Sequence, residues 1–224
     1  MRRWFASPRA PCTTRWSAGY WPRRPPRSPL PALRHSTRRA ERLPGGLGDR
    51  MALLNIITVP HPVLAAEARE VREDEFGPEL ATLLSNMAET MYAAPGVGLA
   101  APQVADGRRI ITVDPGEGDM RGTKLYKMVN PRITDWSKDT IQWRETCLSV
   151  PELEVEVERH LRVFVEWRDA EGGHHSQWFE EFEAVIIQHE LDHLVGTVLL
   201  DRVSGFRKRR YLKKAKRREQ VLAH

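Results

Sequence analysis

His189-Glu190-Leu191-Asp192-His193 is the most informative run in the sequence, and it follows the largely apolar run Phe182–Gln188. Residues four apart lie on one face of a helix, so both imidazoles can bind one metal ion, with Glu190 placed as general base toward a water. The apolar run predicts a buried helix over about 182–194, and buried imidazoles and carboxylates are costly without a partner such as a metal. We therefore predict a metal site, although chance could also place two histidines at this spacing.

Two histidines leave a catalytic metal site one ligand short, and the third donor has to come from elsewhere in the chain. The third ligand is a downstream Glu in thermolysin-type peptidases and a third His in metzincins. Neither extended pattern appears in the sequence, and no histidine follows His193 until His224. Upstream, Cys147 lies in Glu145-Thr146-Cys147-Leu148-Ser149 and is the only cysteine besides Cys12. Two cysteines do not make a disulfide framework, which suits a reducing compartment and leaves Cys147 free to bind a metal. The alternative is that Cys147 is a small buried apolar side chain.

A third segment, Gly96-Val97-Gly98-Leu99-Ala100-Ala101-Pro102-Gln103, combines small residues with one amide side chain. Two glycines and two alanines around a turn allow another backbone to approach closely, and Gln103 supplies an amide donor. A tight loop after a helix is the plainer interpretation. The segment is not a phosphate-binding loop, because no Lys-Ser/Thr pair follows it.

The remaining chain alternates between helix-like and strand-like patterns. Residues 78–92 carry leucines and methionines at helical spacing after Pro78, which suits a first helical turn. Short β-like runs follow at 109–113, 127–130, 141–144, 153–157, 161–167 and 176–179, and a basic helix is expected over 205–222. We predict an α+β fold in which antiparallel sheets surround a central metal-binding helix, with one helix in the N-terminal region and a basic helix at the C-terminus.

Charge is distributed unevenly along the 224 residues, whose overall net charge is +5. Residues 1–50 contain twelve arginines and two acids, residues 51–204 contain 14 basic and 27 acidic groups, and residues 205–224 contain nine basic groups and one acid. We expect a catalytic domain over 51–204 with a basic tail over 205–224. No apolar run approaches the roughly 18 residues of a membrane-spanning helix, so no membrane partner is expected.

Residues 1–50 are rich in Arg, Pro and Ser, which predicts disorder. Three interpretations compete for this segment. It is a transit peptide or leader, although its prolines oppose an amphipathic helix; it is a nucleic-acid-binding arm; or it is not part of the functional protein and Met51 is the true start, opening an element over Ala52–Ile57. The third interpretation is favoured.

In their order and spacing, the three motifs resemble those of the peptide deformylases. The family pattern combines Gly-x-Gly-Leu-Ala-Ala-x-Gln, Glu-Gly-Cys-Leu-Ser and Gln-His-Glu-x-Asp-His, and the resemblance covers residues 51–210, including Asn130-Pro131. It implies a metal-dependent hydrolase that removes the formyl group from N-terminal formyl-methionine of nascent polypeptides and releases formate. The protein is then bacterial-type and cytoplasmic, or organellar if residues 1–50 are a transit peptide.

The resemblance also implies roles for individual residues. The implied metal ligands are Cys147, His189 and His193, and Glu190 is the general base and proton shuttle. The Gln103 amide and the Leu148 backbone N–H would form an oxyanion hole. The substrate would pass Val97 and Gly98 like an added strand, with Val185 and Ile186 lining the methionine pocket. Glu145 and Arg159 would form a supporting ion pair, or else two unrelated surface charges.

The implied cofactor is one divalent metal ion, natively Fe(II), and Zn, Ni or Co fit the same ligands because a thiolate suits a softer metal. One position departs from the family pattern, since Thr146 stands where Gly is usual. A β-branched residue is strained there if the backbone has φ > 0, and it narrows the mouth of the site if not. We expect activity to be retained.

Two partners are expected besides the metal, namely formyl-Met nascent peptides and the ribosome, and the chain is expected to be a monomer. The nine Lys and Arg residues of 205–224 suit docking on ribosomal RNA, although a solvated terminal helix has the same composition. Two rival functions remain. One is a catalytically impaired, ribosome-associated relative marked by Thr146, and the other is a zinc endopeptidase, which would have no reason to place Cys147 at this spacing.

Overall fold

The computed structural model describes residues 52–117 and 120–222. Its helices are α1 (Pro78–Ala93), α2 (Glu181–Leu194) and α3 (Gly205–Leu222). The strands are β1 (Gly98–Ala100), β2 (Ile110–Val113), β3 (Tyr126–Trp136), β4 (Thr140–Cys147), β5 (Val150–His160), β6 (Arg162–Arg168) and β7 (His174–Glu180). Four 3-10 turns join them: η1 (Pro62–Ala65), η2 (Glu73–Glu75), η3 (Ala101–Val104) and η4 (Leu199–Arg202). The predicted α+β class with antiparallel sheets and three helices is confirmed.

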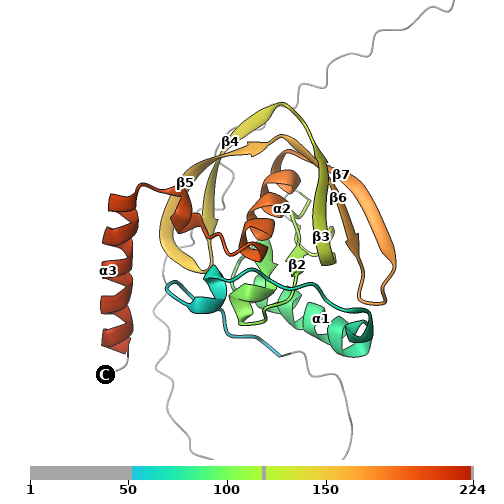
Figure 1. The fold of residues 1–224 in the computed structure, drawn as a ribbon, viewed down its shortest axis with the longest axis horizontal. Coiled ribbons are helices and arrows are strands. Elements are labelled where there is room, and N and C mark those ends of the chain that lie inside the picture. The colour runs from blue at the N-terminus through green and yellow to red at the C-terminus, as the bar shows by residue number, and fades with distance from the viewer. Residues whose placement is uncertain (1–51, 118–119, 223–224) are drawn as a thin grey trace, which may run out of the picture. The chain divides into compact units, whose positions relative to one another are not determined.

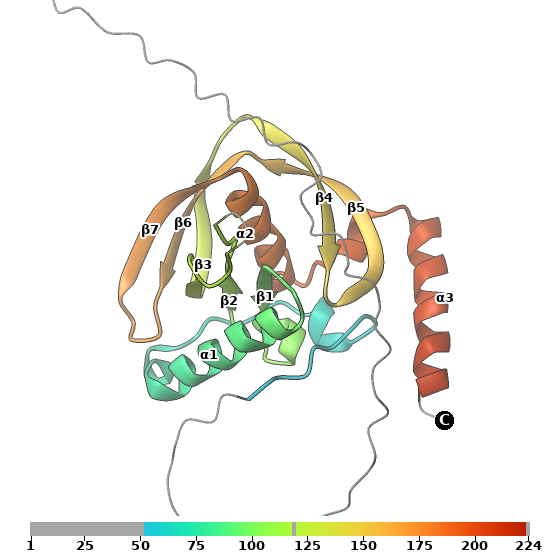
Figure 2. The same cartoon turned by 180° about the vertical axis from the view of Figure 1, so that it is seen from behind.

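The strands form two antiparallel sheets. Five of them pair in the order β1-β2-β3-β6-β7, and β4 and β5 form a separate hairpin. In both views α2 lies between the five-stranded sheet and the β4–β5 hairpin (Figures 1 and 2). The central position of α2 follows from its composition, because a helix whose middle is apolar has to be buried on several sides.

The five-stranded sheet is covered by a different helix on each face of its β1–β2–β3 part. Side chains alternate across a strand, so Ile111 and Met128 pack toward α2, whereas Ile110 and Val129 pack toward α1. From α1, the buried residues Leu80, Leu84, Met87 and Met91 complete that second core. The two cores fix α2 against the sheet edge at β1, which is where the Gly96–Gln103 segment lies.

A third core joins the β4–β5 hairpin to the C-terminal part of the chain. It contains Cys147, Val150 and Leu153 of the hairpin together with Leu199 and Leu200 of η4, and Tyr211 and Leu212 of α3 pack against it. Figures 1 and 2 both draw α3 beside β5. The basic helix is therefore docked on the domain through an apolar side.

Two local expectations differ from the structure. The Gly96–Gln103 segment, for which a tight loop was the plainer interpretation, forms edge strand β1 in its middle and η3 at its end. Small residues hid this strand, since Gly and Ala are depleted in strands. The element expected over Ala52–Ile57 is neither helix nor strand.

The disorder expected over residues 1–50 lies outside the described residues. Within 52–117 and 120–222, no helix combines the length and hydropathy needed to cross a bilayer.

Candidate metal centre

The three predicted metal ligands converge from two elements. Cys147 is the last residue of β4, while His189 and His193 lie on successive turns of α2, with ring centroids 5.2 Å apart. The Sγ atom of Cys147 is 3.3 Å from Nε2 of His193, and one donor atom from each residue lies within 4.8 Å of the other two. One sulfur and two imidazole nitrogens at these separations form a donor set for a single transition-metal ion.

His189 is oriented by a buried ion pair. Its Nδ1 is 2.7 Å from Oε2 of Glu145, and a carboxylate only accepts, so Nδ1 carries the hydrogen and Nε2 is left for a metal. Arg159 donates to the same carboxylate through Nε at 2.7 Å and Nη2 at 3.0 Å. The side chains of Glu145 and Arg159 are only 4% and 6% exposed. The structure thus brings the two residues together as a buried pair behind a ligand, not as separate surface charges.

Burial and ion pairing shift the pKa values of the buried groups in opposite directions. Burial alone would raise the pKa of Glu145, but hydrogen bonds from His189 and Arg159 outweigh it and hold this pKa below its ordinary value. Burial likewise acts to lower the pKa of His189, yet contacts with Cys147 and Glu145 raise it well above the usual range. Burial and the neighbouring His189 lower the pKa of His193, which keeps that imidazole neutral. The donor chemistry, one thiol sulfur and two imidazole nitrogens, fits a divalent ion.

Glu190 is buried beside the ligands and close to β1. Desolvation raises its pKa to about 7, and its Oε2 accepts no hydrogen bond from any of the described residues. Its other oxygen lies against Gly98, where an added Cβ would come within 2.3 Å of Oε1. The absence of a side chain at Gly98 therefore makes the space that Glu190 occupies. A carboxylate with a free oxygen and a pKa near neutrality suits acid–base chemistry.

Gln103 is held in one orientation beside Cys147. The backbone N–H of Ala100 donates to its Oε1 at 2.8 Å, so its Nε2 faces Ser149 Oγ at 3.2 Å and Cys147 Sγ at 3.8 Å. Leu148 follows Cys147 directly and packs its side chain toward Gly96. The Gln103 amide therefore lies against both Cys147 and Ser149, the two residues that flank Leu148 in the sequence.

An apolar wall extends from the ligands along α2 and β4. Val185 and Ile186 lie one turn before His189 and are 2% and 4% exposed, and Val97 packs against the core that contains Ile186. The structure adds two residues that the sequence reading did not single out, Trp143 and Phe182, whose rings stack at 5.4 Å. Trp143 is four residues before Cys147 on β4, hence on the same face of the strand.

Thr146 causes no backbone strain. It lies within β4 with its side chain exposed, and it is not among the residues with positive φ. A β-branched residue is well suited to an extended strand. Its neighbours Glu145 and Cys147 face inward, so Thr146 points to the opposite side of the strand from the ligands.

Two further residues of the motifs turn out to have contacts that the sequence alone did not predict. Asp192 lies between the histidines on α2 and accepts from Arg159 Nη1 at 2.8 Å. Ser149 is fully buried and accepts from Gln103. Both belonged to quoted motifs, so their positions were visible, but their partners are distant in sequence.

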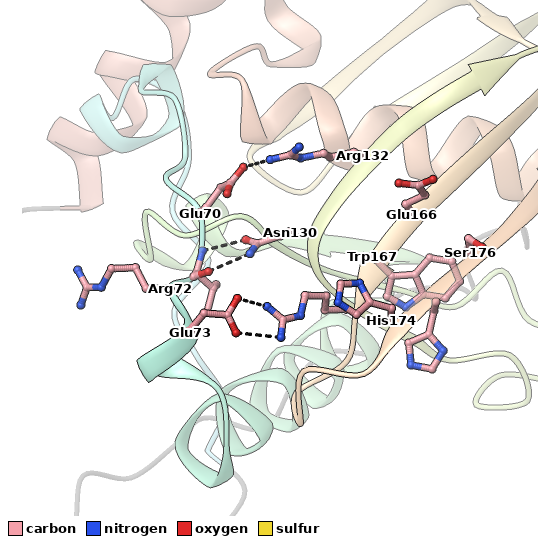
Figure 3. A pocket seen from close by; sticks show the side chains of 12 residues that line it. Glu70, Arg72, Glu73, Asn130, Arg132, Glu166, Trp167, His174 and Ser176 are labelled. Atoms are coloured by element: carbon pink, nitrogen blue, oxygen red, sulfur yellow. Dashed lines mark hydrogen bonds and ion pairs between the residues drawn. The ribbon is translucent and has the colours of Figure 1, made fainter.

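A separate hollow of about 650 Å³ lies away from these ligands, between the 70–73 segment, the middle of β3, the end of β6 and the start of β7 (Figure 3). Two ion pairs join residues that line it, Arg132 with Glu70 and Arg168 with Glu73. None of the ligands or Glu190 lines it. This hollow is therefore separate from the candidate metal centre at the junction of β1, β4 and α2.

Fold and side chains together define the class: an α+β metallohydrolase in which a helical histidine pair and a cysteine form the metal-binding group, with a carboxylate beside it. The model of the polypeptide deformylase family matches residues 53–209. The chain belongs to the polypeptide deformylase family, whose metal-dependent members remove the formyl group from N-terminal methionine.

Individual relatives agree with this assignment. The peptide deformylase of Desulfotalea psychrophila is 39% identical over 167 residues, covering 75% of this chain and 97% of the relative. That of Phenylobacterium zucineum is 40% identical over 168 residues, covering 75% and 97%. Among solved structures, the peptide deformylase of Ehrlichia chaffeensis has a TM-score of 0.70 at 32% identity, covering 77% of this chain and all of that one. These comparisons support the interpretation of the chain as a peptide deformylase over the two rival functions, a catalytically impaired relative and a zinc endopeptidase.

Proposed function

We propose that the chain deformylates nascent polypeptides with Cys147, His189 and His193 holding one divalent ion and Glu190 moving the proton. The observation that carries this assignment is the convergence of three donor atoms within 4.8 Å, beside a buried carboxylate whose Oε2 has no partner among the described residues. That oxygen is free to accept a hydrogen from an attacking water. Fe(II) is the proposed native metal, with Zn, Ni and Co as alternatives that suit one thiolate and two imidazoles.

Different residues of the chain carry the proton transfer and the stabilisation of negative charge during hydrolysis. A bound metal supplies Lewis-acid polarisation of the formyl carbonyl and of the attacking water. Glu190 accepts the proton of that water and later donates it to the departing amine nitrogen, using the Oε2 that has no partner among the described residues. Nε2 of Gln103 and the backbone N–H of Leu148 donate to the formyl oxygen as negative charge develops there. The products are formate and a free N-terminus.

The substrate backbone is proposed to align with β1. This strand pairs only with β2 in the described sheet, so it presents an edge to an extended peptide. Val97 and Gly98 stand at that edge, and Gly98 adjoins Glu190. The methionine side chain would then lie against Val185 and Ile186, with the stacked rings of Trp143 and Phe182 further along the same wall.

Formate release from formyl-Met-Ala by metal-loaded protein tests the proposal. Glu190→Gln keeps the size of the side chain but removes its basicity, so the rate should fall by roughly 10²–10⁴-fold with metal content unchanged. Glu183→Gln, on the first turn of α2, is the matched control and should leave the rate unchanged. An inactive parent protein with full metal content, or a Glu190→Gln variant as active as the parent, would contradict the proposal. Cleavage of unformylated internal peptide bonds would favour an endopeptidase.

A second part of the proposal concerns α3 and its partner. Four of its basic residues are engaged by the domain: Arg207 with the Glu154 carbonyl, Lys208 with Asp201, and Lys214 and Arg218 with Glu152. The other five basic residues are exposed and fall within about a third of the helix circumference at 3.6 residues per turn. They are Arg209, Arg210, Lys213, Lys216 and Arg217. We infer that this outward face docks on ribosomal RNA in the cytoplasm.

The test separates this outward face from the anchoring residues. Replacing the five outward residues by Gln should abolish co-sedimentation with ribosomes at low salt, because phosphate contacts release counterions and dominate the affinity. Formate release should stay unchanged, since α3 remains docked. Ribosome binding that survives the five substitutions, or that does not weaken with salt, would contradict the proposed interface.

A further inference from the structure

The ion pair behind His189 is part of a longer row of alternating charges. From the ligand outward, the row runs through Glu145 of β4, Arg159 of β5, Asp192 of α2 and Arg202 of η4. Exposure of the side chains increases along it, from 4% and 6% to 21% and 40%. The row therefore begins at a buried metal ligand and ends at the surface, and it joins four elements.

Asp192 links the buried part of the row to its exposed end. Its Oδ2 accepts from Arg159 Nη1 at 2.8 Å and from Arg202 Nη2 at 2.7 Å, and Arg202 Nη2 also lies 2.8 Å from Oδ1. Arg159 is thus shared between two carboxylates, one behind His189 and one at the surface. Without a second cation beside it, the Asp192 carboxylate would attract the Arg159 guanidinium more strongly, because Asp192 and Arg159 both lie in a partly dehydrated region.

We propose that Arg202 is a positioning residue for the metal centre. By neutralising Asp192, it leaves the Nε and Nη2 donors of Arg159 on Glu145, and Glu145 in turn fixes the ring of His189 with Nε2 toward the metal. Such outer partners set ligand orientation and metal affinity without touching the ion. Arg202 itself makes no contact with the ligands, so its whole effect passes through Asp192 and Arg159.

An ordinary surface ion pair would have no such effect. Exposed pairs contribute little on average because water screens them and the side chains lose freedom. Arg162 and Glu180 provide that comparison, since they pair at 2.9 Å with exposures of 46% and 59% and lie on β6 and β7. Arg162 resembles Arg202 in type and exposure but connects to no ligand through the described contacts.

The experiment measures the dissociation constant of Co(II) by competition with a chelator, and the visible absorption of the Co(II)-loaded full chain. Arg202→Met should weaken Co(II) binding by about threefold to tenfold, less than the roughly 10–100-fold typical of direct outer partners. It should also shift the Co(II) absorption bands, which report ligand geometry. Arg202→Lys should restore much of the Co(II) affinity and of the parent absorption spectrum. Arg162→Met should change neither the affinity nor the spectrum.

A double-mutant cycle decides whether the effect passes through Asp192. In an Asp192→Asn background, Arg202→Met should cause no further loss of Co(II) affinity, because the charge that Arg202 balances is gone. Equal affinity and identical spectra for Arg202→Met and the parent would overturn the proposal. So would an effect of the same size in the Asp192→Asn background, which would indicate a general structural role.

Discussion

Two ion clusters of similar composition involve residues of the β4–β5 hairpin. The inner cluster, Glu145, Arg159, Asp192 and Arg202, starts at 4% exposure behind His189. The outer cluster, Glu152, Lys214 and Arg218, joins β5 to α3, and its carboxylate is 61% exposed. Each shares one carboxylate between two cations. Only in the inner cluster are the charged groups buried away from water. Removing one partner there therefore leaves another charge buried and unpaired.

The contrast explains why the two regions should respond differently to the same kind of substitution. In the inner cluster, ion pairing orients a metal ligand, and the pairing is enforced by burial. In the outer cluster, pairing adds to the apolar packing of Tyr211 and Leu212 that already docks α3. Equivalent truncations of one arginine in each cluster therefore measure what burial adds to an ion pair.

The largest effect is expected from Arg159→Met. It leaves Glu145 buried without its bidentate partner, which should lower the free energy of unfolding by roughly 3–5 kcal/mol. Arg218→Met in the outer cluster makes the same chemical change at an exposed carboxylate, and the urea midpoint should not move measurably. Urea unfolding of both variants, each without added metal, makes the comparison. Similar shifts for the two arginines would show that burial does not separate the clusters.

A smaller effect is expected from Gly98→Ala, which tests how tightly the inner region is packed around Glu190. The added Cβ would lie 2.3 Å from Oε1, so Glu190 has to move at a cost of about 1–3 kcal/mol. The rate of formate release should fall by roughly tenfold to a hundredfold. At Gly107 an added Cβ meets nothing within 4 Å, so Gly107→Ala is the control and should keep the parent rate. An unchanged rate for Gly98→Ala would mean that Glu190 has room that the structure does not show.

The smallest effect is a pH dependence of the outer region. A hydrogen bond from Lys214 lowers the pKa of Glu152, and Arg218 adds to the shift. Burial acts to raise the pKa of Asp201, but hydrogen bonds from Lys208 and from the Val198 N–H outweigh it and lower this pKa. A carboxyl with a lowered folded pKa stabilises the fold above its ordinary pKa, and that stabilisation is lost as pH falls through the folded value. Amide exchange in α3, corrected for intrinsic rates, should therefore be less protected at pH 3, which is below the ordinary pKa of both carboxyls, than at pH 6.5.

Glu152→Gln is the matched variant for the pH measurement. It should already show weaker α3 protection at pH 6.5 and a smaller further loss at pH 3, because one of the two titrating carboxyls is gone. Protection that is independent of pH in the parent protein would mean that apolar packing alone holds α3 in place.

The sequence predicted what depends on local pattern. The helices begin and end within two residues of the predicted bounds, because apolar spacing, Pro78 and the basic run are local features. The metal-binding trio was accessible as well, since His189 and His193 are four apart and Cys147 is the one thiol in the acidic part of the chain.

Partners that are remote in sequence were not predictable in this way. Edge strand β1 is stabilised by its pairing with β2, not by the propensity of Gly98 and Ala100. The contact of Asp192 with Arg202 needs the turn after α2, and the stack of Trp143 on Phe182 needs the approach of β4 to α2. Each depends on tertiary packing, which no local pattern specifies.

X-ray absorption at the metal edge of the Co(II)-loaded protein tests the central claim most directly, because it reads the atoms bound to the ion. One sulfur and two imidazole nitrogens should be found in the parent, and the sulfur should disappear in Cys147→Asp. A shell of nitrogen and oxygen alone in the parent protein, at full metal occupancy, would contradict the assignment of Cys147 as a ligand.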